Sequence, residues 1–160
     1  MTLTLTGDGI VVKDGEVKFR KAYGVRSINT KEKVDNETLF ACASTTKAMT
    51  ALAMGILVDQ GKVNWDDKVT KYIPYFKLYD PYVTADIRVR DLFLHNSGVG
   101  NTDYLWAFDD ITGDEVIRRM QFVKPSYEYR AGFVYQNIFY HMAGKVIEQV
   151  SGTTWADYLT

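Results

Sequence analysis

The stretch from Ser44 to Gln60 constrains the fold more than any other part of the sequence. It lies between a Ser-Thr pair that can cap a helix and Gly61, a favourable residue just beyond a helix end, so it predicts one long helix. Its side chains are Ala, Met, Leu, Ile and Val on nearly every face. A helix that is apolar all round is expected to be buried, and the rest of the chain must therefore surround it.

The composition suits such a buried helix. Of the 160 residues, 46% are hydrophobic and 14% aromatic, which is typical of one globular domain and excludes a disordered chain. The 19 Lys and Arg balance the 20 Asp and Glu without a basic run, so we expect no nucleic-acid partner. Ala48–Val58 is too short to span a membrane. The single cysteine, Cys42, excludes a disulfide scaffold.

Turn signals and periodicity predict the other elements. Asp14-Gly15 predicts a hairpin turn between an apolar run at Ile10–Lys13 and an alternating run at Glu16–Tyr23. In the second strand we expect Val17 and Phe19 to face inward. Further helices are predicted at 66–73, 89–95, 114–123, 138–150 and 154–159, and loops at 72–82, 100–110 and 125–136.

Ser44-Thr45-Thr46-Lys47 is the sharpest motif for chemistry. Positions i and i+3 at a helix start share one face, so the Ser44 hydroxyl and the Lys47 ammonium are expected to lie close together. A serine becomes a nucleophile when a base takes its proton, and a lysine desolvated among apolar side chains suits that role. The alternative is an N-cap serine and a lysine that reaches solvent, although the apolar helix leaves little open surface for it.

The second candidate motif is Tyr135-Gln136-Asn137, just before the predicted helix at 138–150. Tyr135 could donate or relay a proton, and Asn137 could hold a substrate amide or orient Lys47. The alternative interpretation makes Asn137 a helix cap and Tyr135 a packed aromatic residue.

The two histidines are expected to have structural roles. His95 ends a short helix, where a cation suits the dipole and the ring can bond a carbonyl group, and His141 is expected in the core. The sequence contains no paired Cys/His spacing and no HExxH motif, so we expect no metal site. It also lacks a P-loop and a G-x-G-x-x-G motif, so we expect no cofactor. A Ser-His-Asp triad stays open, because its spacing is not fixed.

Taken in order, these segments resemble the serine β-lactamase and penicillin-binding-protein superfamily, in particular its class C-like branch with D-alanyl-D-alanine carboxypeptidases and esterases. The resemblance covers nearly the whole chain, and the ordered set is more specific than any one motif. The stretches that carry it are Val11–Val17 with Ala22–Val25, Thr38–Phe40 with Ser44–Lys47, Gly61–Pro74, Ile87–Leu92 with His95–Val99, and Phe133–Asn137 with Tyr140–Gly152.

This resemblance implies an α+β, β-lactamase/transpeptidase-like fold. Residues 1–43 would form N-terminal strands, and residues 44–160 a mainly helical region that carries both motifs. The family's third motif, a Lys or His followed by Ser or Thr and then Gly on a late strand, has no counterpart after Asn137. The strands that close the family's sheet against the opening hairpin are absent as well. We therefore expect the chain to be the N-terminal portion of a longer family member.

The resemblance also implies a role for each site residue. Ser44 would be the acylated nucleophile, and its backbone N–H one oxyanion donor. Lys47 would be the base or proton partner, Tyr135 the second acid/base, and Asn137 the contact to the substrate amide. Neither metal nor cofactor would be needed. Aromatic side chains at Tyr104, Trp106 and Phe108 would either wall the substrate pocket or pack elsewhere.

The implied function is hydrolysis of an amide or ester, such as a β-lactam, a D-Ala peptide or a small ester, through an acyl-serine intermediate. The alternatives are a non-catalytic scaffold of the same fold that binds a ligand or partner, and a site completed by a second chain that supplies the missing strands. Met1–Ile10 lacks the basic start and apolar core of a signal peptide, while the resemblance favours a periplasmic or extracellular location.

Overall fold

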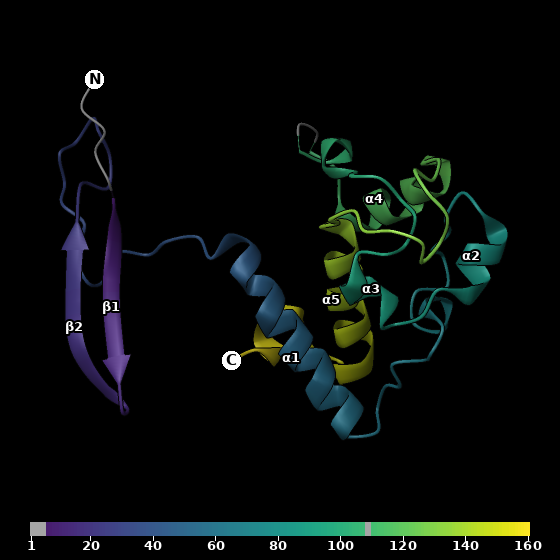
Figure 1. The fold of residues 1–160 in the computed structure, drawn as a ribbon, viewed down its shortest axis with the longest axis horizontal. Coiled ribbons are helices and arrows are strands. Elements are labelled where there is room, and N and C mark those ends of the chain that lie inside the picture. The colour runs from purple at the N-terminus through teal and green to yellow at the C-terminus, as the bar shows by residue number, and fades with distance from the viewer. Residues whose placement is uncertain (1–5, 108–109) are drawn as a thin grey trace. The chain divides into compact units, whose positions relative to one another are not determined.

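The computed structural model describes residues 6–107 and 110–160 and shows two compact units, Met1–Ala43 and Ser44–Thr160. The first unit is built on an antiparallel hairpin and the second is mainly helical, which confirms the α+β class (Figure 1). The strands are β1 (Gly7–Lys13) and β2 (Glu16–Tyr23). The α-helices are α1 (Thr46–Asp59), α2 (Pro81–Asp86), α3 (Asp91–Leu94), α4 (Gly113–Arg119), α5 (Ile138–Ser151) and α6 (Trp155–Tyr158). Among the described residues, 3₁₀ turns span Ala43–Thr45, Val69–Lys71, Asp103–Leu105 and Met120–Phe122.

The hairpin follows its predicted turn. Asp14 and Gly15 have φ angles of 54° and 77°, and positive φ at both turn residues is what a tight right-twisted hairpin requires. The expected inward orientation of Val17 and Phe19 is wrong, because these side chains are 58% and 45% exposed. The physical reason is that the sheet contains only two strands in the described part of the chain, so its apolar side chains have nothing to pack against.

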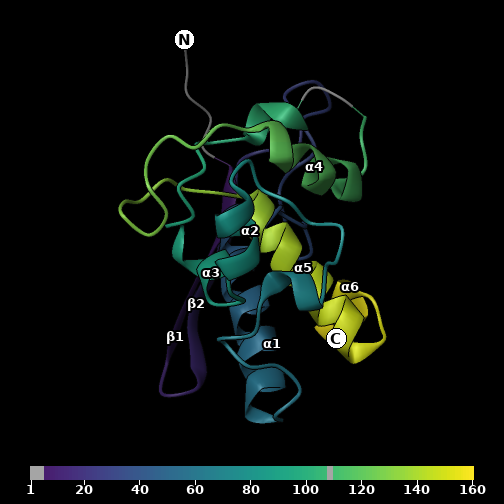
Figure 2. The ribbon, with the colours of Figure 1, turned by 90° about the vertical axis from the view of Figure 1, so that its right-hand side faces the viewer.

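The core of the helical unit is organised around α5. This helix contacts α1, α3, α4 and α6, and α1 lies beside it in both views (Figures 1 and 2). Its inward side chains, Phe139, Met142, Val146 and Ile147 among them, are almost completely buried. The helix ends at Gly152, whose φ of 75° gives the left-handed cap that the sequence predicted.

The expectation of full burial for α1 is only half right. Met54 and Leu57 are fully buried in the core, whereas Met49, Leu52 and Ile56 are 47%, 66% and 42% exposed. The reason is that the described residues cover one face of this helix and leave the other open. The helix also begins later than predicted, at Thr46 after a 3₁₀ turn, and no side chain caps it.

Two short helical predictions need correction. The loop predicted at 72–82 runs into α2, because Asp80 caps this helix by accepting hydrogen bonds from two backbone N–H groups and Pro81 occupies its first turn. The helix expected from Asp66 is reduced to the 3₁₀ turn Val69–Lys71. None of the helices in the described residues is long and apolar enough to cross a membrane.

An ion-pair cluster joins α3 to the loop that leads into α5. The carboxylate of Asp91, 1% exposed, accepts hydrogen bonds from the guanidinium of Arg130, the hydroxyl of Tyr129 and the backbone N–H of Arg88. Burial raises the pKa of Asp91, but the hydrogen bonds from Arg130 and Arg88 outweigh burial and leave this pKa below its usual value. The cluster therefore fixes the loop that carries Tyr135.

Replacing Arg130 with methionine is expected to lower the free energy of unfolding by about 3 kcal/mol, because it leaves the Asp91 charge buried without its ion-pair partner. We take the lower end of the usual range, since the Arg130 side chain is 38% exposed. Urea unfolding measures the change, with Lys124→Met, an exposed cation of the same loop, as the control. Equal stability of the two variants would show that the cluster does not anchor the loop.

Candidate active site

The four residues predicted for the site come together. Ser44 lies in the 3₁₀ turn Ala43–Thr45, Lys47 in the first turn of α1, and Tyr135 and Asn137 in the segment that enters α5. The ammonium of Lys47 donates to Ser44 Oγ at 3.2 Å and to Asn137 Oδ1 at 2.6 Å. The hydroxyl of Tyr135 donates to Ser44 Oγ at 2.7 Å. Residues about 90 positions apart in sequence thus meet around one hydroxyl group.

The backbone before α1 presents Ser44 at the helix entrance. Ala43 has a φ of 44°, in the left-handed region that costs a non-glycine residue free energy. The chain then makes one 3₁₀ turn before α1 begins. Ser44 is therefore placed beside the positive end of a 14-residue helix, where negative charge on the substrate is stabilised.

Lys47 points into the site, so the alternative in which it reaches solvent is wrong. The side chain is half-buried, and its ammonium lies 4.8 Å from the ring centroid of Tyr135 and 5.3 Å from that of Tyr140. Two aromatic faces and two hydrogen bonds therefore hold the cation in place of water. Asn137 occupies the N-cap position of α5 as expected, but its side chain does not cap the helix.

The hydroxyl of Tyr135 is chemically tuned. Its pKa is lowered mainly by hydrogen bonding with the Lys47 ammonium and next by that with Ser44. A lowered pKa makes more of the phenol available in its ionised form, which is the form that can accept a proton. The arrangement can therefore move a proton between Ser44 and Tyr135 while Lys47 stabilises the negative charge.

His95 supports the Tyr135 ring instead of acting as a helix-end cation. The two ring planes are tilted by 34° with their centroids 4.7 Å apart, and His95 Nδ1 accepts a hydrogen bond from the backbone N–H of Gln136 at 3.1 Å. Burial, followed by the charge of Lys47, lowers the pKa of His95. The prediction of a charged histidine that bonds a carbonyl group is therefore wrong, because the ring is used as a neutral acceptor.

The depressed pKa of His95 gives a pH dependence with a definite sign. An unfolded histidine has a pKa of about 6.5, so between that value and the lower folded pKa the unfolded state binds more protons. The free energy of unfolding is expected to fall as the pH drops below about 6.5. Urea unfolding of the protein and of His95→Gln at several pH values isolates this contribution, since the variant should lose part of the slope. Identical slopes would contradict it.

Gln136 was not singled out from the sequence, although it ties the site to a neighbouring loop. Its side chain is completely buried and its amide donates to the carbonyl groups of Val99, at 2.7 Å, and of Gly100. Thr102 donates to its carbonyl oxygen at 3.2 Å. The sequence signal that could have identified Gln136 is its position between two residues that point into the site. Neighbouring side chains in extended backbone point in opposite directions, so the residue between them is expected to point away from the site.

Asp103 is the second residue that the motif reading missed. It begins the 3₁₀ turn Asp103–Leu105, and its carboxylate accepts a hydrogen bond from Asn137 Nδ2 at 2.9 Å. The site therefore continues from Ser44 through Lys47 and Asn137 to a carboxylate.

A pocket of about 300 Å³ adjoins Asn137. Trp106, one of the expected aromatic walls, lines it, whereas Tyr104 is 79% exposed and does not. Phe108 lies outside the described residues. His141 also lines this pocket and is exposed, so the prediction of a core histidine is wrong.

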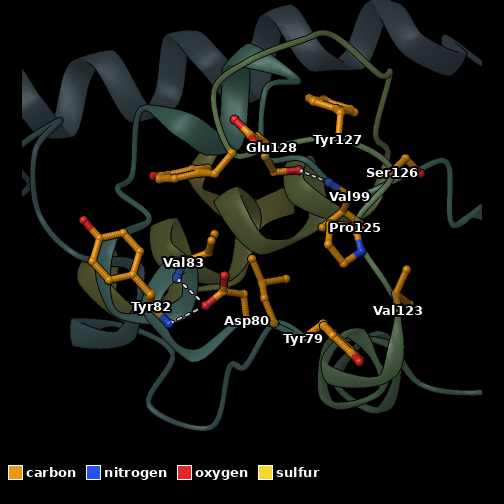
Figure 3. A pocket seen from close by; sticks show the side chains of 13 residues that line it. Tyr79, Asp80, Tyr82, Val83, Val99, Val123, Pro125, Ser126, Tyr127 and Glu128 are labelled. Carbon is orange, nitrogen blue, oxygen red and sulfur yellow. Dashed lines mark hydrogen bonds between the residues drawn. The ribbon is translucent and has the colours of Figure 1, made fainter.

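A second pocket, of about 550 Å³, lies between α2 and residues 123–129 (Figure 3). Asp80 at its edge is occupied as the cap of α2, with its bonds to Tyr82 and Val83 drawn as dashed lines in Figure 3. None of the four predicted site residues lines this pocket. Across residues 6–107 and 110–160, no three His, Cys, Asp or Glu side chains are grouped so that they could hold a metal ion.

Comparison with known proteins agrees with the sequence resemblance. The model of the family described as Beta-lactamase matches residues 9–160. Protein flp of Staphylococcus aureus (strain COL) is 28% identical over 156 residues, a match covering 94% of this chain and 31% of flp. The chain thus spans about a third of the length of this curated relative.

Solved structures show the same fold. The octameric penicillin-binding protein homologue from Pyrococcus abyssi matches with a TM-score of 0.80 and 31% identity, over 94% of this chain and 36% of that one. The D-amino acid amidase from Ochrobactrum anthropi SV3 matches with a TM-score of 0.75 and 25% identity, over 94% of this chain and 41% of the amidase.

Proposed function

The chain belongs to the beta-lactamase family, and from this premise we propose that it forms part of a serine hydrolase that cleaves an amide or ester through an acyl-Ser44 intermediate. One observation carries the proposal: Ser44 Oγ is within hydrogen-bond distance of both the Lys47 ammonium and the Tyr135 hydroxyl. A serine needs a proton acceptor to attack a carbonyl group, and Tyr135 in its phenolate form would be that acceptor, with the Lys47 ammonium on the other side of the Oγ atom.

In the proposed reaction, Tyr135 in its phenolate form accepts the proton of Ser44 while the Oγ atom attacks the substrate carbonyl carbon. The Lys47 ammonium stabilises the phenolate, in keeping with the lowered pKa of Tyr135. Tyr135 then returns the proton to the leaving amine or alcohol as its bond to carbon breaks. A water molecule hydrolyses the acyl ester and restores Ser44.

The oxyanion of the tetrahedral intermediate requires hydrogen-bond donors. The backbone N–H of Ser44, beside the α1 N-terminus, is the donor that this chain would supply. The family's second donor comes from the strand of the third motif, which has no counterpart after Asn137 in this sequence. Loss of one such donor costs about 10²–10³ in rate, so the proposal includes further strands, from additional residues or from a second chain.

The proposed substrates are β-lactams, D-Ala peptides and small esters. A D-amino acid amidase among the structural matches supports an amide as the bond that is cleaved. Carboxypeptidase and esterase activities are both compatible with an acyl-serine intermediate. Asn137 borders the 300 Å³ pocket, where it could contact the amide of the acyl group.

Burst kinetics test the proposed function. With a p-nitrophenyl ester or a chromogenic β-lactam, an acyl-enzyme mechanism releases about one equivalent of chromophore per protein before the steady state. The second candidate function is a non-catalytic scaffold of the same fold. A scaffold would bind the same compounds saturably and release no chromophore, and that result would overturn the hydrolase proposal.

A further inference from the structure

We propose that Asp103 is a positioning residue that fixes the orientation of the Asn137 amide and thereby the place of the Lys47 ammonium beside Ser44. The inference deepens the proposed function and rests on it for its kinetic consequences. Nothing in the Ser44 or Tyr135 motifs requires an acidic residue at this position, and it is the contacts of Asp103 that give it this role.

The side-chain amide of Asn137 is hydrogen-bonded at both of its ends. Its Nδ2 donates to Asp103 Oδ2 at 2.9 Å, and its Oδ1 accepts from Lys47 Nζ at 2.6 Å. A carboxylate can only accept and an ammonium can only donate, so the amide fits between them in one orientation. The flipped amide would place its NH₂ group against the ammonium and its oxygen against the carboxylate. Asp103 and Lys47 therefore select the same rotamer from opposite ends.

Asp103 is held in place by hydrogen bonds of its own backbone and of the preceding residue. Its backbone N–H donates to Asn101 Oδ1 at 3.0 Å, at the start of the 3₁₀ turn. The preceding residue, Thr102, is 4% exposed and bonded to Gln136, the neighbour of Asn137. The carboxylate and the amide that it contacts are thus tied to each other through a short and mostly buried connection.

Burying the carboxylate of Asp103 at this position costs free energy. In the described part of the chain, Asp103 Oδ1 is buried and has no hydrogen-bond partner. An unpaired buried oxygen destabilises the fold, and a charged one more so than a neutral one. A carboxylate at this position differs from a neutral amide in that both of its oxygens can only accept hydrogen bonds. The oxygen of this carboxylate that faces Asn137 accepts a hydrogen bond from its amide, and the other end of the same amide accepts from the Lys47 ammonium.

The test compares Asp103→Asn with the parent protein in the rate of acylation by an activated ester. Asparagine keeps the size of the side chain but can either donate or accept, so the Asn137 amide loses one of the two contacts that fix its orientation and keeps only the contact with Lys47. We expect a decrease of about tenfold or more, because the Asn137 amide loses its hydrogen bond to a charged group. We also expect a shifted pH–rate profile, which a merely structural change would not produce. Asp110→Asn, an exposed acid of the same loop, is the matched control and should match the parent.

A double-mutant cycle separates positioning from other effects. If Asp103 acts through Asn137, then Asp103→Asn should have little further effect in an Asn137→Ala background. Additive losses, or a parental rate in Asp103→Asn, would overturn the inference. A thermal unfolding curve for each variant distinguishes a positioning effect from partial unfolding.

NMR of the Asn137 side chain tests the positioning role of Asp103 independently of catalysis. The side-chain NH₂ signals of Asn137, assigned by their disappearance in Asn137→Ala, report its hydrogen bond directly by NMR. In Asp103→Asn we expect these signals to shift or broaden, and in Asp110→Asn to stay in place. Unchanged signals in Asp103→Asn overturn the positioning role even if the protein is acylated. Changed signals in a protein that is never acylated support the positioning role while the hydrolase proposal fails.

Discussion

Replacing Ser44 with alanine is expected to abolish covalent acylation by a β-lactam or an activated ester. The Ser44 Oγ atom is the point where the Lys47 ammonium and the Tyr135 hydroxyl converge, at 3.2 Å and 2.7 Å. Without this oxygen no bond to the acyl group can form, so both the burst of product and the mass adduct should disappear. The measurement is the burst amplitude per protein in stopped-flow experiments.

The matched control for this prediction is Ser126→Ala, which removes an exposed serine outside the site. It should retain the full burst amplitude. Ser44→Ala should also unfold at nearly the same temperature as the parent, because Ser44 is exposed and not part of the core. A burst that survives in Ser44→Ala would show that another group is the nucleophile.

The second large effect is expected for Lys47→Met, which keeps the length of the side chain but removes its charge. The variant loses the hydrogen bonds to Ser44 and Asn137 and the strongest influence that lowers the Tyr135 pKa. Because positioned proton transfer contributes about 10²–10⁴ in rate, the acylation rate should fall by about that factor. The limb of the pH–rate profile that reports Tyr135 should move to higher pH, since the phenol returns toward its usual pKa.

Lys62→Met is the control for this second prediction, because Lys62 is an exposed lysine just beyond the end of α1. It should leave the acylation rate and the pH profile unchanged. If Lys47→Met kept both the parental acylation rate and the parental pH–rate profile, the pKa of Tyr135 would not depend on the Lys47 ammonium. The proposed proton transfer from Ser44 to Tyr135 would then be wrong.

Local sequence rules predicted the parts of the site that are local in the chain. The Ser44–Lys47 contact follows from helical spacing alone, and α5 follows from its clear apolar period and its terminal glycine. The meeting of Tyr135 and Asn137 with Ser44 was different, because it joins segments about 90 residues apart. Only the ordered resemblance to a family pointed to that long-range contact.

The residues that sequence reasoning missed are those whose role depends on tertiary contacts. Asp103 and Gln136 carry no motif, and their partners become visible only when residues 99–103 lie against the start of α5. His95 was misread for the same reason. Its helix-end position suggested a cation, whereas burial beside Lys47 disfavours the charged form.

The errors in burial share one physical cause. The apolar pattern of α1 and of the hairpin correctly indicates faces that stabilise a fold when covered, but a pattern does not say what covers them. In the described residues Leu52 is 66% exposed and Val17 58% exposed. The pattern therefore identified the apolar surfaces of α1 and the hairpin correctly, but the expectation that other parts of the described chain cover them was wrong.

The acyl-Ser44 intermediate is tested most directly by the mass of the protein after exposure to a penicillin or an activated ester, followed by peptide mapping. We expect one adduct per protein, with the acyl group on the peptide that contains Ser44 and on that hydroxyl oxygen. An adduct on a different residue, or binding of the same compound without any adduct, would contradict it.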